Sequence, residues 1–187
     1  MTLFEYLVVL LSIVLSLGVV RLLDALPAAL LPGRRDWLHL VWLAFVFLTH
    51  VQYWWVFWSY HDVTTWTYPG FVLALASPVL LYSLAITVAP RRAHQVESWR
   101  AYFWARRVRF FSLFAAWMIL VSVANVLVLG QSFAHPVRAG QGTAVAFFVA
   151  GAASEKMWVH KLIAFVAILA YVALLTTMFF RPAPLVP

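Results

Sequence analysis

The feature that most restricts the fold is a run of 25 residues, from Trp37 to His61, without a single Asp, Glu, Lys or Arg. About 20 consecutive apolar residues are enough for a helix to cross the hydrocarbon core of a bilayer. Charged residues make up only 10% of the 187-residue chain, against about 25% in soluble domains. We therefore expect an all-α, polytopic transmembrane helical bundle that forms one domain over residues 1–187.

Three histidines, His39, His50 and His61, lie in this run at intervals of 11 residues. In a continuous helix, 11 residues make three turns plus about 20°, so the three rings should form one stripe with steps of about 16 Å. His50 lies near the middle of the span, where an ionisable group usually faces the protein interior or a cavity. We interpret it as a mid-membrane polar site, the alternative being a neutral histidine hydrogen-bonded to another helix.

Other side chains could complete this site or lead to it. Tyr53 and Trp54 follow His50 on one helical face, and Ser122 and Asn125 lie in a later apolar segment. Buried hydroxyl and amide groups of this kind often bond between membrane helices. The candidate mid-membrane site is therefore His50, Tyr53, Trp54, Ser122 and Asn125, and the candidate path or mouth is His39, His61, Glu5, Ser12 and Ser16.

Turn residues divide the chain into six apolar segments. The third contains Pro78, which removes a helical hydrogen bond and should bend that helix. The fifth is short and rich in small residues, so the alternative is five spans with a re-entrant fifth segment. The expected spans are residues 3–31, 37–60, 68–89, 108–129, 139–154 and 158–180.

Basic residues concentrate in alternate connections. Arg34 and Arg35 lie in the first connection, Arg91 and Arg92 begin the third, and Lys156 lies in the fifth. Cytoplasmic connections of membrane proteins carry an excess of Lys and Arg. Six spans would place these three connections in the cytoplasm and both termini in the periplasm of a bacterial inner-membrane protein.

The segment from Ser98 to Phe110 mixes aromatic residues with arginines. Nucleic-acid-binding proteins use such a mixture, but next to membrane helices an interfacial element on anionic lipid explains it better. Membrane lipid is therefore an expected partner, and nucleic acid is not. We expect anionic headgroups to contact Arg91, Arg92, Arg100, Arg106, Arg107 and Arg109.

Small residues recur at four-residue intervals in the fifth segment. They are Gly142, Ala146, Ala150 and Ser154. Such a small-xxx-small pattern lets two helices approach closely. We expect this face to pack, either within the protomer or between protomers of a homo-oligomer.

The motif content argues against most enzyme classes. The chain contains no cysteine, which excludes disulfides, thiolate nucleophiles and cysteine metal sites. Its sequence has no Walker loop, GxSxG elbow or HExxH motif. We predict no catalytic residue, no metal and no resident cofactor. A haem would need axial histidines from two segments, for which His39 with His160 and His61 with His135 are the available pairs.

Three motifs resemble those of a group of small, uncharacterised bacterial inner-membrane proteins. They are Phe4-Glu5-Tyr6, Ser12-Ile13-Val14-Leu15-Ser16-Leu17-Gly18 and His50-Val51-Gln52-Tyr53-Trp54-Trp55. The resemblance extends over most of the chain and implies a bacterial polytopic membrane protein. It implies no activity, so no functional residue can be transferred from it.

Three functions are compatible with these features. The first, which we favour, is a small oligomeric channel or transporter-like bundle for a proton, ion or small solute, with His50 as its mid-membrane site. The second is a membrane redox protein that binds haem or quinone through its histidines. The third is an accessory subunit that binds lipid or another membrane protein through the small-residue face.

Overall fold

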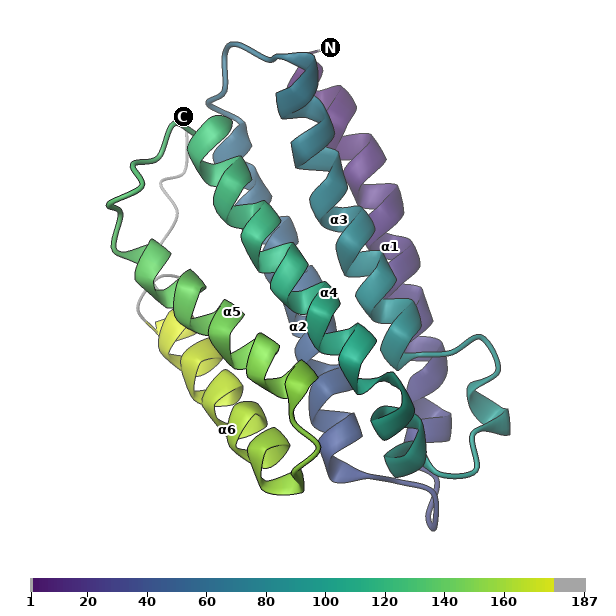
Figure 1. Cartoon of the computed structure of the whole chain (residues 1–187). Coiled ribbons are helices and arrows are strands. Elements are labelled where there is room, and N and C mark those ends of the chain that lie inside the picture. The colour runs from purple at the N-terminus through teal and green to yellow at the C-terminus, as the bar shows by residue number, and fades with distance from the viewer. Residues whose placement is uncertain (1, 177–187) are drawn as a thin grey trace.

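The computed structural model describes residues 2–176, in which every regular element is a helix. Figure 1 shows the long helices running up and down beside one another, so that consecutive helices are antiparallel. Since this part of the chain contains no strand, the predicted all-α class is confirmed. The elements are α1 (Leu3–Leu30), α2 (Trp37–Phe57), the short 3-10 helix η1 (Trp58–Tyr60), α3 (Tyr68–Val88), the 3-10 helix η2 (Ala93–Gln95), α4 (Trp99–Leu127), α5 (Val137–Ala153) and α6 (Met157–Leu174).

Five of the helical segments are long and apolar enough to cross a membrane. They are Leu3–Leu30, Trp37–Tyr60, Tyr68–Gln95, Trp99–Leu127 and Met157–Leu174. The predicted end of the last span, residues 177–180, lies outside the described residues. The remaining helix, α5, has 17 residues, or about 26 Å at 1.5 Å per residue, which is slightly less than the hydrocarbon thickness of about 30 Å.

The short helix α5 lies beside α4 over the whole length of α5. Near its start Gln141 bonds to Ser122, and just after its end the Ser154 carbonyl accepts a hydrogen bond from Arg107. Those two partners on α4 are 15 positions apart, so α5 does not turn back at mid-depth. The structure thus describes six antiparallel helices, and the sixth membrane span, with its re-entrant alternative, stays a prediction for α5.

Side-chain caps define where four of the helices begin. Thr2, Asp36, Thr67 and Ser98 each precede a helix and accept a hydrogen bond from the backbone amide three residues later. The first amides of a helix have no intrahelical partner, and such caps satisfy one of them. An unsatisfied backbone group is costly in or near lipid, so these residues help to fix the helix boundaries.

Helix α4 begins earlier than the sequence pattern indicates. The helix is continuous from Trp99, so the segment interpreted as interfacial belongs to the same helix as the apolar segment, and the span from residue 108 stays a prediction. Arginine is a good helix former, and α4 contains no Gly or Pro. The arginine-rich part of the sequence is therefore the first third of a membrane helix.

The helices form a bundle with α3 between α1 and α4, and with α2 packed behind them (Figure 1). The pair α5–α6 lies beside this bundle, with α5 against α4 and α6 against α2. We call the end that carries connections 31–36 and 89–98 the arginine end, and the opposite end the far end. α1 begins at the far end.

Aromatic side chains fill the space between α2, α4 and α5. The Trp42 ring lies 5.2 Å from that of Phe110 and 5.3 Å from that of Phe111, measured between centroids. Phe114 stacks on Phe148 of α5 at 4.8 Å. These rings are almost fully buried, so they contribute van der Waals packing between α2 and α4 and, through Phe148, between α4 and α5.

Candidate functional site

His50 is buried in the middle of the bundle, with only 1% of its surface exposed. Its Nδ1 atom lies 2.7 Å from the carbonyl oxygen of Val46, one turn earlier in α2. A carbonyl can only accept, so Nδ1 carries the hydrogen and Nε2 of the neutral ring carries a lone pair. Nε2 has no hydrogen-bond partner among the residues that the structure describes. The predicted mid-membrane histidine therefore has one free proton-accepting atom.

Gly18 of α1 provides the space for this ring. A Cβ atom placed at residue 18 would lie 2.3 Å from His50 Nε2 and 2.8 Å from its Cδ2. Both distances are far below van der Waals contact, so only glycine lets α1 and α2 approach this closely at His50. The free nitrogen thus faces the backbone of α1 instead of a polar side chain.

Tyr53 compensates for the proline in α3. Pro78 has no amide hydrogen, so the carbonyl of Ala74 loses its helical donor. The Tyr53 hydroxyl donates to that carbonyl at 3.3 Å. The neighbouring Ser77 of α3 is also buried. Its hydroxyl forms no hydrogen bond with any of the described residues. The predicted site residue Tyr53 of α2 therefore binds the carbonyl of α3 that Pro78 leaves without a donor.

His39 lies on the same buried face of α2, nearer the arginine end. Its ring stacks on Trp99 at 4.5 Å and meets the edge of Tyr102 at 5.9 Å. The ring lies near the backbone of Val88, but neither of its nitrogens reaches hydrogen-bond geometry. The indole nitrogen of Trp42, one turn further along, is likewise buried without a partner in the described chain. Unpartnered nitrogen atoms therefore recur along this face of α2.

The predicted stripe of three histidines is wrong at the far end. Regular α-helix ends at Phe57, and the 3-10 turn of η1 rotates the chain by about 120° per residue instead of about 100°. His61 consequently lies on the surface, stacked on Trp58 at 5.0 Å. Trp54 is also misassigned to the His50 face, because 47% of it is exposed. Tyr60 takes the buried position at this end.

Ser122 and Asn125 do not join His50. The Ser122 hydroxyl shares a hydrogen bond with the Gln141 side chain, which also contacts Arg138. Arg138 in turn donates to Gln131 at 2.8 Å. Asn125 lies one turn from Ser122 and is half-buried. These residues form a separate polar chain between α4 and α5 that leads toward the far end.

A cavity opens at the far end, between the α2–α3 and α4–α5 connections. Its volume is about 470 Å³. Its lining is about equally polar and apolar, and it begins at Ser59, one residue from the buried Tyr60 of the α2 face. The residues around it are Ser59, Asp62, Val63, Thr64, Thr65, Val128, Leu129, Gly130 and Gln131.

The predicted mouth residues of α1 are not gathered around this cavity. Glu5 forms a capping box, since its carboxylate accepts from the Thr2 amide at 2.8 Å. Ser16 is exposed and Ser12 is half-buried. The assignment of Glu5 to a mouth is therefore replaced by a structural role at the start of α1.

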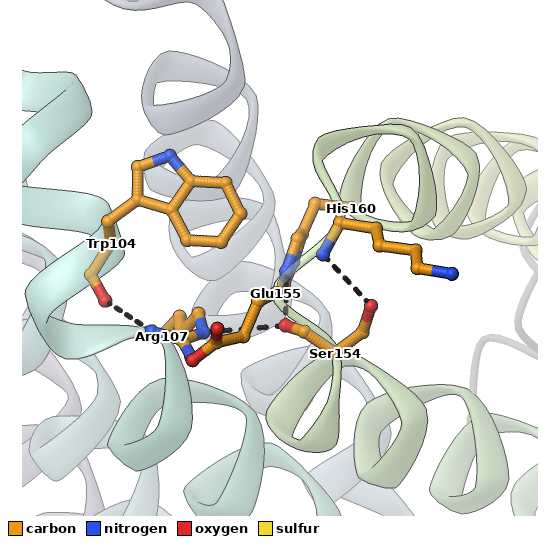
Figure 2. Close-up of polar contacts among 6 residues, drawn as sticks. Trp104, Arg107, Ser154, Glu155 and His160 are labelled. Atoms are coloured by element: carbon orange, nitrogen blue, oxygen red, sulfur yellow. Dashed lines mark hydrogen bonds and ion pairs between the residues drawn. The ribbon is translucent and has the colours of Figure 1, made fainter.

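A third buried histidine, His160, belongs to a polar cluster at the arginine end (Figure 2). Its Nε2 donates to the Ser154 carbonyl at 3.0 Å, and Arg107 Nε donates to the same oxygen at 3.4 Å. Arg107 also binds the Glu155 carboxylate at 2.6 Å and the Trp104 carbonyl at 3.2 Å. The cluster ties the α5–α6 turn to α4. The sequence pattern indicated Arg107 as a lipid contact, Ser154 as part of the small-residue face and His160 as a possible haem ligand, but it did not indicate this cluster.

The haem pairs expected from the sequence are held by other contacts. His160 lies against Trp104 at 4.8 Å and Phe111 at 5.4 Å, whereas His39 is stacked on Trp99. His61 and His135 both lie on the surface, and His135 accepts a hydrogen bond from the Val137 amide at 3.4 Å. A haem between either pair would have to replace these contacts, and haem binding stays a prediction.

The small-residue face of α5 does not pack within the protomer. Gly142, Ala146 and Ala150 are all exposed. The glycine that packs is Gly151, where a Cβ atom would lie 3.0 Å from the Phe111 ring. Packing of this face within the protomer, one of the two predicted alternatives, is therefore wrong. Its packing between protomers stays a prediction.

Comparison of the chain with models of known families finds no match, and none is found among curated proteins or solved structures. The resemblance of three motifs to small bacterial inner-membrane proteins stays a prediction. Any function must therefore be argued from the arrangement of the side chains.

Proposed function

We propose that the chain is a multi-pass protein of the bacterial inner membrane that conducts protons along the buried face of α2, with His50 as its mid-membrane site. One observation carries the proposal. The ring nitrogens of His39, the indole nitrogen of Trp42 and Nε2 of His50 lie on this face, buried and without partners in residues 2–176. Buried polar atoms are normally satisfied, so a row of exceptions marks a place where protons or water can bind.

A proton suits this face better than a hydrated ion does. The free nitrogen of His50 is in tight contact with Gly18, which leaves no room for an ion with its water shell. Imidazole accepts a proton near neutral pH. The gap of about 16 Å between His39 and His50 is too long for direct transfer, so water admitted transiently must bridge it. Toward the far end the face leads past Tyr53 to Tyr60, beside the cavity that Asp62 lines.

The orientation belongs to the same proposal. Arginines gather at one end of the bundle, and we infer that this end lies in the cytoplasm. The natural chain has no cysteine, so a single cysteine can report which side a residue faces. Gln95→Cys should be labelled from the cytoplasm and Thr64→Cys from the periplasm by a membrane-impermeant maleimide. The reverse pattern would overturn the orientation.

Proton flux in liposomes tests the function itself. The purified chain is reconstituted with a pH-sensitive dye inside and a potassium diffusion potential across the membrane. We expect dye acidification above that of empty liposomes, and its loss in His50→Gln, which keeps a polar side chain that cannot be protonated. His94→Gln is the matched control, because His94 is exposed in the 89–98 connection.

Two outcomes would contradict the proposal. The first is flux no faster than in empty liposomes, and the second is equal flux in His50→Gln and the unaltered chain. Size-exclusion profiles of all three proteins show whether the variants are folded.

The third predicted function, an accessory subunit, is favoured by a different observation. The exposed face of Gly142, Ala146 and Ala150 would let a helix from another subunit approach closely. Co-purification of a fixed partner, lost in Ala146→Leu, would support this function. A homo-oligomer disrupted by the same substitution would instead fit an oligomeric proton channel.

A further inference from the structure

The arginines of α4 fall into two groups. Arg107 is neutralised by Glu155 at 2.6 Å. Arg106 and Arg109 are exposed, and neither forms an ion pair with a carboxylate of the described residues. Glu97, the acidic residue of the neighbouring connection, is exposed and unpaired in the same part of the chain. Arg106 and Arg109 therefore lack an internal counter-charge, as does the exposed Arg100 on another side of α4.

These two arginines share one face of α4 with Tyr102. The three residues stand at positions i, i+4 and i+7, which lie on one side of a helix. The guanidinium carbon of Arg106 lies 5.7 Å from the centroid of the Tyr102 ring, a cation–π distance that orients the side chain. Arg100 is about 120° to 180° away from these residues around the helix. The arrangement is therefore a pair of guanidinium groups on one face, of which Arg106 is oriented by the Tyr102 ring.

A hydrogen bond places this face at the membrane boundary. The Tyr102 hydroxyl donates to the Thr87 carbonyl at 2.9 Å, and Thr87 lies in the last turn of α3. With 21 residues, α3 is about 31 Å long, close to the hydrocarbon thickness of about 30 Å. Its last turn therefore lies near the headgroups. Arg109 begins about 10 Å deeper, two helical turns past Tyr102, and its long side chain can extend back along the surface toward them.

We propose that Tyr102, Arg106 and Arg109 form a binding site for the headgroup of an anionic phospholipid. The guanidinium fork matches the oxygens of a phosphodiester. A lipid phosphate is the anion present at this depth, and α3 and α4 expose apolar side chains deeper in the membrane that acyl chains can contact, such as Val79 and Val108. The two arginines lie on α4, outside the proton path on α2, although the Tyr102 ring meets the His39 ring of that path at 5.9 Å.

Native mass spectrometry of the full chain tests this site. The delipidated protein is titrated with phosphatidylglycerol, with phosphatidylcholine of the same acyl chains, and with inorganic phosphate. We expect phosphatidylglycerol to bind more tightly than phosphatidylcholine. Each basic residue near an anionic surface contributes about 1 kcal/mol, so Arg106→Gln/Arg109→Gln should weaken phosphatidylglycerol binding about 30-fold.

The matched control is Arg35→Gln/Lys156→Gln, which removes the same charge from two exposed basic residues outside the site. We expect this pair to change the affinity by less than about threefold. Equal losses in the two double variants would overturn the proposal, because they would indicate diffuse attraction to charge. Equal binding of the two lipids by the unaltered chain, or displacement of phosphatidylglycerol by inorganic phosphate, would also overturn it.

Discussion

The middle of α2 and the start of α6 each bury a histidine, and they use it differently. His50 and His160 are both at most 1% exposed, and each gives one ring nitrogen to a backbone carbonyl. His160 lies among aromatic rings and shares its carbonyl with Arg107, whose charge opposes a second positive charge. His50 contacts bare backbone at Gly18 and forms no ion pair in the described chain. The comparison separates a histidine that fixes a turn from one that is available for a proton.

The largest expected effect comes from Gly18→Ala. The added Cβ would lie 2.3 Å from His50 Nε2, so the ring or α1 must move, at a cost of about 1–3 kcal/mol. Thermal unfolding in detergent should show a clear loss of stability. Gly142→Ala is the control, because its Cβ would meet nothing within 4 Å.

A double variant sharpens this prediction. His50→Ala removes the ring, so Gly18→Ala should be much less harmful when His50 is already alanine. Additive losses would mean that the clash at Gly18 does not involve His50, and the two helices would have to be arranged differently.

An intermediate effect is expected where α2 meets α3. Tyr53→Phe removes the donor to the Ala74 carbonyl and should lower the unfolding free energy by about 0.6 kcal/mol. In Pro78→Ala the new amide can satisfy Ala74, so Tyr53→Phe should then have almost no effect. Equal losses in both backgrounds, measured by denaturation in mixed micelles, would refute the role assigned to Tyr53.

The smallest effect is expected at the His160 cluster. Glu155 is 83% exposed at its side chain, and exposed ion pairs contribute at most about 1 kcal/mol. Glu155→Gln should leave global unfolding nearly unchanged while hydrogen exchange of residues 154–160 becomes faster. Lys156→Gln, which makes no ion pair in the described residues, should leave that exchange as it was. Unchanged exchange in Glu155→Gln would show that the ion pair does not hold the turn.

Much of the fold follows from local sequence. The charge-free run from Trp37 to His61 indicates where α2 lies. Asp36 and Thr67 cap the starts of α2 and α3. Length, hydrophobicity and capping are local properties of the sequence. The sequence pattern did not indicate that α4 already begins at Trp99, because its first third is rich in arginine. A change from apolar to basic residues marks the membrane boundary, but it does not end a helix when Gly and Pro are absent.

The site was less predictable because it depends on contacts between distant helices. Periodicity identified His50, but not that Gly18 makes room for it. The 3-10 turn that displaces His61 has no clear sequence signal. The spacing of Gly142, Ala146 and Ala150 indicated packing, whereas the contact to Phe111 uses Gly151, which lies outside that pattern.

The protonation of His50 in a bilayer is the measurement that tests the account most directly. In solid-state NMR of histidine-labelled protein, the His50 signals are assigned by their loss in His50→Gln. We predict that Nδ1 carries the hydrogen and Nε2 is bare in alkaline buffer, and that Nε2 gains a proton as the pH falls while the protein stays folded. A hydrogen on Nε2 with a bare Nδ1, or a ring that remains neutral until the protein unfolds, would contradict it.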